Sequence, residues 1–459
     1  MNLSFGTRLF NLKSKSTQWL ILVPALFCIA IFIFHFSVIR ANAVNVPFWD
    51  DWAAFDEDNH PASLDLPWMF RRHNEHRIVT TKLFIWAQFQ LNGWNIRTHL
   101  LFAFLIYGSV LVLLWWFTRN WTSQTHGWML LCFIPFFLTP LGRFDHFMAF
   151  TVSVHLWLLF FFPVAYFLFA RDQRWARLVL GWAFSILSIY SWAAGFVTAL
   201  ILLIGFSAFK TLRAYSATTK PERTREVLQL VASLTVVGIA LISWLHDYRK
   251  PAHHPALVFP YQLEFWNFFS NLVSLGLGIG RISMLAGIIC LLVILIPVVG
   301  IIWRKRLNMS ASQWAVCVSV LALLGNQCAI TMGRTGFGIA DSKNPEYAEI
   351  GVPLVILIVA SWIIFLEHRK TLKRSAVGLL WIFFFVIFLN KWGDFWIYRA
   401  QREVRVEGVR CIQAYYDRKG DGHCPTIFPA DRSIGPFLDR AKRLDASFYR
   451  EATANSESR

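Results

Sequence analysis

The segment WLILVPALFCIAIFIFHFSVI, residues 19–39, decides the fold class. It has the length of roughly 20 apolar residues that a helix needs to cross a bilayer. Arg8, Lys13 and Lys15 precede it, and it lacks the small-residue cleavage site of a removed signal peptide. The segment therefore predicts a first membrane-spanning helix, with residues 1–18 as a cytoplasmic N-terminus.

Further apolar runs recur along the chain, whose composition is 56% hydrophobic. They cover residues 99–117, 128–141, 150–170, 178–193, 195–209, 227–245, 281–303, 312–331, 350–366 and 375–392. Together with the first segment they predict an all-α polytopic membrane protein with about eleven transmembrane helices over residues 19–393. The first loop between spans, residues 40–98, is long.

The positive charges support one orientation of these spans. Lys and Arg gather in alternate short loops, which marks those loops as cytoplasmic. The basic residues concerned are Arg119, Arg171, Arg174, Arg177, Lys210, Arg213, Lys220, Arg223, Arg225, Arg304, Lys305, Arg306, Arg369, Lys370, Lys373 and Arg374. An odd number of spans then places residues 394–459, a short C-terminal tail, on the outer side. The net charge of +17 is explained by orientation, and no nucleic acid partner is expected, because no nucleic-acid-binding motif is present.

One apolar stretch does not fit this alternation. Residues 260–280 are rich in aromatic residues, Asn and Gly, and a crossing there would invert every later loop. The basic loops from Arg304 onward keep their alternation only if this stretch does not cross. It is therefore predicted to be an interfacial or re-entrant helix on the outer face.

Two of the 7 cysteines lie in the C-terminal tail. If the outer compartment is oxidising, Cys411 and Cys424 can form a disulfide. Two cysteines alone define no disulfide framework, so an unpaired state remains the alternative at this point.

The loop after the first span opens with PFWDDW, which contains Asp50 and Asp51. The flanking Trp49 and Trp52 are expected at the level of the lipid headgroups. Desolvation and mutual repulsion raise the pKa of one acid in such a pair unless a cation compensates, so the two aspartates are candidates for a general base or for metal ligands. The alternative is a solvated acidic loop.

The sequence RRHNEHRI follows in the same loop. If it opens a helix, His73, His76 and Arg77 share one face and Glu75 points away. Arg72 and Arg77 are candidates for binding a phosphate or pyrophosphate, and either histidine for assisting a leaving group or binding a metal. The alternative is an amphipathic helix whose basic face meets anionic membrane lipids.

A later loop, GRTGFGIADSKNPEYAE, carries Arg334 directly after a span and Tyr347 before the next. Its glycines allow backbone amides to approach an anion closely. Arg334 is therefore a further candidate for phosphate binding, with Tyr347 beside it. The alternative is that the glycines serve only the turns of the loop.

A first span, a long outer loop opening with an acidic pair and about eleven spans together resemble the GT-C integral-membrane glycosyltransferases. PFWDDW and HNEHRI are similar to the loop signature of a bacterial branch of that group. The resemblance implies a bacterial inner-membrane enzyme that transfers a sugar from a polyprenyl-phosphate-linked donor to a glycan, lipid or protein acceptor of the cell envelope.

The same resemblance implies Asp50 or Asp51 as base or metal ligand, and Arg77 and Arg334 as contacts of the donor phosphate. Members of the group often carry an Asp-x-Asp motif where this chain has adjacent acids, so a requirement for a divalent cation, Mg²⁺ or Mn²⁺, stays open. The rival interpretations are a transporter or flippase of a lipid-linked sugar, an O-antigen ligase or polymerase, and a non-catalytic assembly protein. A transporter would concentrate ionisable residues within its spans.

Overall fold

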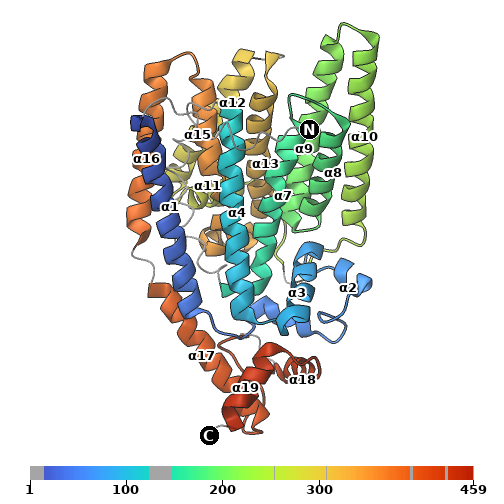
Figure 1. Ribbon diagram of the computed structural model, residues 1–459, viewed down its shortest axis with the longest axis vertical. Coiled ribbons are helices and arrows are strands. Elements are labelled where there is room, and N and C mark those ends of the chain that lie inside the picture. Colours follow the sequence, from blue (N-terminus) through green and yellow to red (C-terminus); the bar gives the residue numbers. More distant parts are fainter. Residues whose placement is uncertain are drawn as a thin grey trace.

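The computed structural model describes residues 15–122, 147–252, 254–305, 308–392, 396–428 and 433–457, and the described part is a helical bundle with a smaller helical cap at one end (Figure 1). The bundle contains α1 (Lys15–Asn42), α4 (Ile96–Thr122), η5 (Ala149–Thr151), α7 (Val152–Leu168), α8 (Trp175–Ile189), α9 (Ala193–Ser216), α10 (Lys220–Leu245), α11 (Leu263–Gly276), α12 (Met284–Lys305), α13 (Ala311–Arg334), α14 (Ala348–Gly351), α15 (Leu354–Phe365) and α16 (Lys370–Trp392). The short 3₁₀ helices η7 (Thr335–Phe337), η8 (Ile339–Lys343) and η9 (Pro345–Tyr347) join α13 to α14.

Eight helical segments of the described chain are long and apolar enough to cross a membrane, which confirms a polytopic membrane protein. Two further predicted spans correspond to helices, the shorter apolar α8 and the helix α16. The predicted span 128–141 lies outside the described residues. The number eleven and the side of the membrane on which each terminus lies remain predictions.

The stretch 260–280 contains α11, a 14-residue helix that is too short to be a span. Most of its side chains are buried, and Figure 1 shows it within the bundle, so of the two predicted alternatives a re-entrant helix fits and an interfacial helix does not. The side of the membrane on which it lies remains a prediction. A Cβ added to Gly276 would lie 2.5 Å from the Cα of Gly351 in α14. Glycines at this contact let the two backbones approach closely, which draws α11 into the protein interior.

The cap combines the first loop with the C-terminal residues. It contains η1 (Trp49–Phe55), α2 (Leu66–Phe70) and α3 (Val79–Asn92) from the loop, and α17 (Trp396–Tyr416), α18 (Gly435–Arg443) and α19 (Ser447–Glu457) from the chain end, all at the same end of the bundle (Figure 1). The helices α17, α18 and α19 of the C-terminal tail thus cover the first loop.

Trp52 explains why the two segments stay together. Its side chain is fully buried, and its ring lies 6.4 Å from that of Phe437 in α18 and 5.5 Å from that of Phe448 in α19. Burial of aromatic rings of this size stabilises the interface strongly. The prediction that Trp52 sits among lipid headgroups is therefore wrong; its neighbour Trp49 is 45% exposed.

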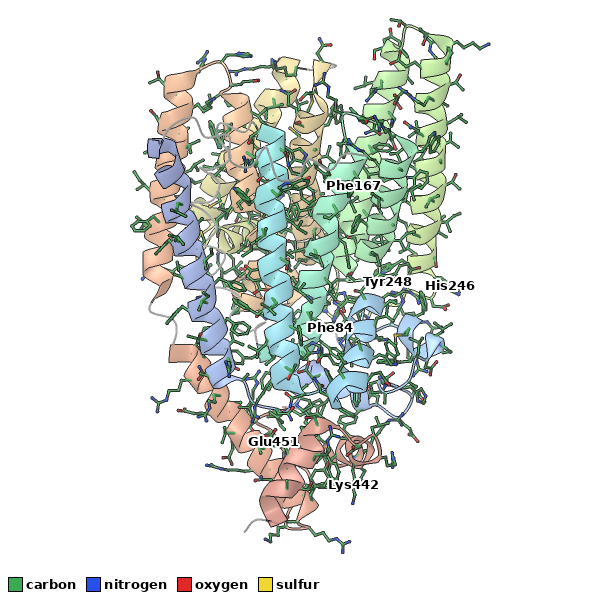
Figure 2. All side chains as sticks on the ribbon, viewed as in Figure 1. Phe84, Phe167, His246, Tyr248, Lys442 and Glu451 are labelled. Atoms are coloured by element: carbon green, nitrogen blue, oxygen red, sulfur yellow. A yellow bond between two sulfur atoms is a disulfide. The ribbon has the colours of Figure 1, made fainter. Side chains whose placement is uncertain are left out.

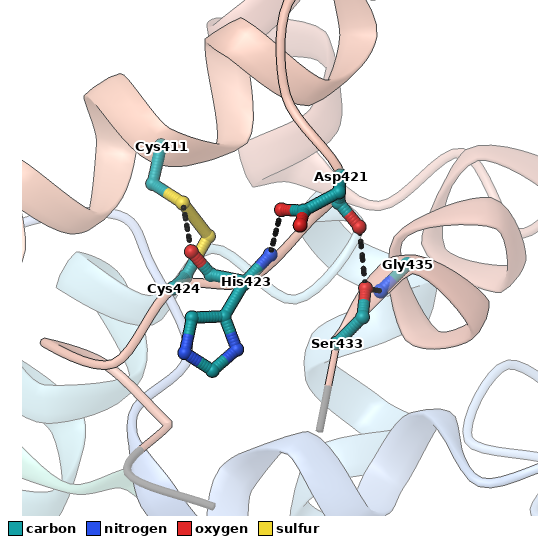
Figure 3. The surroundings of a disulfide bond; sticks show 6 residues. All are labelled: Cys411, Asp421, His423, Cys424, Ser433 and Gly435. Atoms are coloured by element: carbon teal, nitrogen blue, oxygen red, sulfur yellow. Dashed lines mark hydrogen bonds between the residues drawn. A yellow bond between two sulfur atoms is a disulfide. The ribbon is translucent and has the colours of Figure 1, made fainter. Parts of the chain in front are cut away.

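Cys411 of α17 and Cys424 form a disulfide, with an S–S distance of 1.98 Å (Figure 3). The adjoining loop is held by its own polar groups. The carboxylate of Asp421 accepts a hydrogen bond from the backbone N–H of His423, and the hydroxyl of Ser433 donates to the Asp421 carbonyl at 2.6 Å. The disulfide ties this loop, which leads into α18, to α17.

Candidate functional site

The segment RRHNEHRI does not open a helix. His73 and His76 exchange two backbone hydrogen bonds of 2.9 Å each, so residues 73–76 form a tight turn, in which Asn74 has a φ of 50°. Asn is one of the few residues that tolerate this left-handed conformation. The helix α3 begins only at Val79. The turn directs Glu75 into a cavity, so the prediction that Glu75 points away is wrong.

This cavity has a volume of about 500 Å³ and lies between the bundle and the turn. Its wall is mainly apolar and includes side chains of η5, α7, α9 and α13. Five of the predicted site residues line it, namely Asp50, His73, His76, Arg334 and Tyr347. Polar residues that were not predicted line it as well, namely Glu75, Lys250, His254, Asn326 and Glu346. The cavity therefore gathers polar groups from the first loop, from the loop after α10, from α13 and from η9, which are far apart in the sequence.

Asp50 and His73 form one part of the polar wall. The Nε2 atom of His73 lies 3.6 Å from Oδ2 of Asp50. The Asp50 side chain is 52% exposed and that of His73 is 16% exposed. The imidazole edge also contacts the ring of Phe150, at 4.9 Å between centroids, which holds its orientation. An accessible carboxylate beside an imidazole has the geometry of a proton acceptor.

Asp51 has the opposite environment. It is completely buried, and its carboxylate accepts backbone N–H groups of Phe48, Ala149 and Phe150 at 2.9–3.1 Å. Burial raises the pKa of Asp51 to about 6, although the three N–H groups and the nearby Arg405 act in the other direction. Asp51 thus connects the first loop to η5 and is closed to a substrate.

Arg72 and Arg77 connect the turn to the end of α10. Nε of Arg77 donates to the carbonyl of Trp244 at 3.2 Å, and Nη2 of Arg72 donates to that of His246 at 3.0 Å. The Arg72 guanidinium also lies 4.9 Å from the Trp244 ring. Figure 2 shows His246 at this end of α10, above α2 and α3. Neither arginine lines the 500 Å³ cavity, so their predicted role as contacts of a donor phosphate there lacks support.

Glu75 is the centre of a second polar group in the cavity wall. Its carboxylate accepts from Nη2 of Arg334 at 2.7 Å and lies 3.6 Å from Nε2 of His254 and 3.5 Å from Nε2 of His76. Burial acts to raise the pKa of Glu75, but His76, Arg334 and His254 together hold that pKa below its ordinary value. The group therefore carries an ionised Glu75 and a guanidinium that is 24% exposed to the cavity.

His76 is a neutral member of this group. Burial lowers its pKa to about 4, with Glu75 acting in the opposite direction. Nδ1 of His76 accepts the backbone N–H of Ala193 at 3.3 Å, which places the proton of the neutral ring on Nε2, toward Glu75. His76 is thus suited to position Glu75 and is poorly suited to accept a proton.

The adjacent acids do not fit a shared metal site. Both oxygens of Asp51 already accept backbone N–H groups, so Asp50 and Asp51 cannot chelate one ion together. Within the described residues, no group of three or more His, Cys, Asp or Glu side chains has the geometry to hold a metal ion. The reaction proposed for this site uses no metal ion.

A buried pair of a histidine and a glutamate lies inside the bundle, where the sequence predicts almost no acids. Nε2 of His155 in α7 lies 2.6 Å from Oε2 of Glu349 in α14, and the two side chains are 1% and 2% exposed. Nδ1 of the same histidine lies 3.1 Å from the carbonyl of Ala103. A hydrophobicity pattern does not reveal such a pair, because the two residues are 194 positions apart and the pattern carries no information on which helices meet.

A second cavity, of about 570 Å³, adjoins the first under the cap. The two share Asp50, His73, Asn74 and Phe150 in their walls. The second is mainly polar. The predicted site residue Arg72 lines it, as do Asp56, Glu57, Asp58, Asn59, Arg71 and Lys82 and the aromatic rings of Trp49, Phe428 and Phe437. Asp50 and His73 therefore lie where an apolar and a polar cavity meet. No protein-family model, curated protein or solved structure matches this chain.

Proposed function

We propose that the protein is a membrane glycosyltransferase, which moves a sugar from a polyprenyl-phosphate-linked donor to a glycan, lipid or protein acceptor on the outer face of a bacterial inner membrane. The position of Asp50 and His73 in the wall shared by the two cavities carries this proposal. The apolar cavity between the helices suits a donor that carries its own lipid, and the polar cavity under the cap suits a hydrophilic acceptor.

In the proposed reaction Asp50 takes the proton of an acceptor hydroxyl, and the oxygen forms a bond to the anomeric carbon of the donor sugar. The bond from that carbon to the phosphate oxygen breaks, and the electron pair leaves with the polyprenyl phosphate. Arg334 stabilises the charge on this leaving group, while Glu75, at 2.7 Å, holds the guanidinium in place. His73 orients the Asp50 carboxylate.

The test is transfer of radiolabelled sugar from polyprenyl-phosphate donors to an extracted cell-envelope acceptor by the purified protein. Asp50→Asn should lower the transfer rate about 10³-fold, since a positioned general base contributes roughly 10²- to 10⁴-fold. Asp172→Asn is the matched control, because Asp172 is an acid at the opposite end of the bundle that pairs with Arg174. Undiminished transfer by Asp50→Asn would remove Asp50 as the base, and no transfer by the wild type with any donor would reject the enzyme.

A transporter of lipid-linked sugars is the second candidate, favoured by the buried His155–Glu349 pair inside the bundle. Movement of fluorescent polyprenyl-phosphate sugar across reconstituted vesicles distinguishes the two functions. A transporter would move the lipid without an acceptor and would lose this activity in Glu349→Gln, whereas the proposed enzyme would not move it.

A further inference from the structure

The inner part of the 500 Å³ cavity contains a buried amide with an unused hydrogen-bond donor. Asn326 of α13 lines this cavity and is 2% exposed. Its Nδ2 atom has no hydrogen-bond partner among the described residues. A buried donor without an acceptor costs free energy, and such a group is retained where a ligand supplies the acceptor.

The position of Asn326 relative to Arg334 defines the depth of this donor. Asn326, Ile330 and Arg334 all line the cavity and are spaced four residues apart, so they share one face of α13. At a rise of about 1.5 Å per residue, Asn326 lies roughly 12 Å along the helix axis from Arg334. The two side chains therefore border different depths of one cavity, and only a ligand that extends from Arg334 into the bundle contacts both.

Neutral groups also line this cavity. Thr151 and Ser153 bring hydroxyl groups to the wall from η5 and α7, and Trp192 brings an indole ring at the start of α9. An aromatic face beside amide and hydroxyl groups suits a sugar ring, which presents apolar C–H faces and hydrogen-bonding hydroxyls. A polyprenyl chain, in contrast, has no acceptor to offer the Asn326 amide.

We infer that Asn326 is a specificity-determining residue for the donor sugar, whose hydroxyl oxygen accepts a hydrogen bond from Nδ2. This inference rests on the proposed function, because it assigns the sugar of the proposed donor to the inner cavity. The lipid carrier itself then makes no contact that depends on the amide. An uncharged hexose or pentose is the class of sugar proposed, since the amide offers a hydrogen bond and no charge.

The test measures equilibrium binding of polyprenyl phosphate and of polyprenyl-phosphate hexoses and pentoses to the purified protein. Asn326→Leu should raise the dissociation constant of at least one sugar-bearing form roughly tenfold, which corresponds to the loss of one net hydrogen bond. The dissociation constant of the sugar-free carrier should change less than about twofold, the difference expected from repacking alone. Ile330→Leu, on the same face of α13, is the control and should affect carrier and sugar-bearing forms equally.

Thermal unfolding separates this role from a structural one. In the ligand-free protein Asn326→Leu should keep or raise the melting temperature, because it removes an unpartnered buried donor. Asn326→Asp, of nearly the same shape, serves as a second variant and should also weaken sugar-dependent binding. A lower melting temperature in both variants, or equal loss of affinity for the carrier and the sugar-bearing forms, would overturn the inference.

Binding measurements, which need no sugar transfer, distinguish failure of the inference about Asn326 from failure of the proposed function. If the carrier and its sugar-bearing forms bind equally and Asn326→Leu changes neither, the inference fails while a polyprenyl-phosphate site remains. If the wild type binds neither the carrier nor any sugar-bearing form, the proposed function fails and the inference fails with it.

Discussion

The two ends of the helical bundle each contain a cluster of charged side chains. The cluster near the cap lines the 500 Å³ cavity, whereas the central pair of the other cluster is completely buried. At the end away from the cap, Nζ of Lys210 donates to Glu226 at 2.7 Å and to Gln229 at 2.6 Å, and Arg213 lies 3.2 Å from the same carboxylate. Lys210 and Glu226 are completely buried. At the other end, the Glu75 and Arg334 side chains are 16% and 24% exposed to the cavity.

The comparison of the two clusters shows what distinguishes a structural charged cluster from a candidate binding site. The Lys210–Glu226 cluster satisfies its charges with protein groups, so it fixes α9 against α10 and leaves no room for a ligand. The cavity cluster combines accessible charged groups with an apolar space of ligand size. The accessible space beside the charges, and not their number, identifies the candidate site.

The largest expected effect concerns the buried Lys210–Glu226 cluster. Glu226→Gln should lower the free energy of unfolding by about 3–5 kcal/mol, because it leaves the buried Lys210 ammonium without its counter-charge. Polyprenyl-phosphate binding per folded molecule should stay unchanged. Thermal unfolding in detergent and ligand binding measure the two effects, with Glu222→Gln, on the exposed first turn of α10, as the control. Lost binding in well-folded Glu226→Gln would contradict the distinction between the two ends.

An intermediate effect is expected from Asp51. Asp51→Ala should lower the free energy of unfolding by about 1–3 kcal/mol, because it removes the acceptor of three backbone N–H groups. Asp50→Ala, at a half-exposed site one residue away, should change it by less than about 0.5 kcal/mol. Thermal unfolding of both variants against the wild type measures the contrast. Equal destabilisation by the two changes would contradict it.

The same pair of variants predicts a pH dependence. The pKa of Asp51 is about 6 in the folded protein, against an ordinary value of 3.8, so between about pH 4 and pH 6 the folded state binds more protons at this site than the unfolded chain. Rising pH therefore lowers the contribution of Asp51 to the free energy of unfolding over this window, and the contribution of its hydrogen bonds remains above it. The difference in stability between wild type and Asp51→Ala should narrow from pH 4 to pH 6 and then stay constant. If the difference in free energy of unfolding between wild type and Asp51→Ala instead grew with pH, the pKa of Asp51 would not be raised in the folded protein.

The smallest expected effect concerns Arg334 in the cluster that lines the cavity. Arg334→Gln should weaken binding of polyprenyl phosphate about tenfold, since it removes a charge-assisted hydrogen bond to the phosphate. Arg304→Gln is the matched control at the opposite end, where the guanidinium donates to the carbonyl of Phe365. Binding of fluorescent polyprenyl phosphate measures both. Equal affinities for the two variants would remove Arg334 from the site.

The candidate site was only partly predictable from its residues. An acidic pair and a histidine-rich run in one loop predict Asp50 and His73 as site residues. Charged groups beside a membrane cost desolvation free energy, so their presence there indicates a function. Asp51 has the same residue type, and nothing in the sequence distinguishes it from Asp50. Its burial arises from N–H groups of Ala149 and Phe150, about a hundred residues away.

Glu75 and Asn326 show the two ways in which local patterns fall short. The spacing of the run predicts a helix on which Glu75 faces away from the histidines. The structure instead has a tight turn at His73–His76, which directs Glu75 into the cavity. Asn326 lies in an apolar run, where a single polar residue has no periodic signal, and only the cavity shows that its amide is available to a ligand.

The sequence by itself determined that this is a helical membrane protein, because apolar segments long enough to cross a bilayer must form helices that satisfy their own backbone hydrogen bonds. It also located the first loop as the richest in chemistry. The tertiary structure alone decided that α17, α18 and α19 fold over this loop and that α11 is buried in the bundle. It also decided that Asp50 is open while Asp51 is closed, because each of these outcomes depends on contacts between segments far apart in the chain.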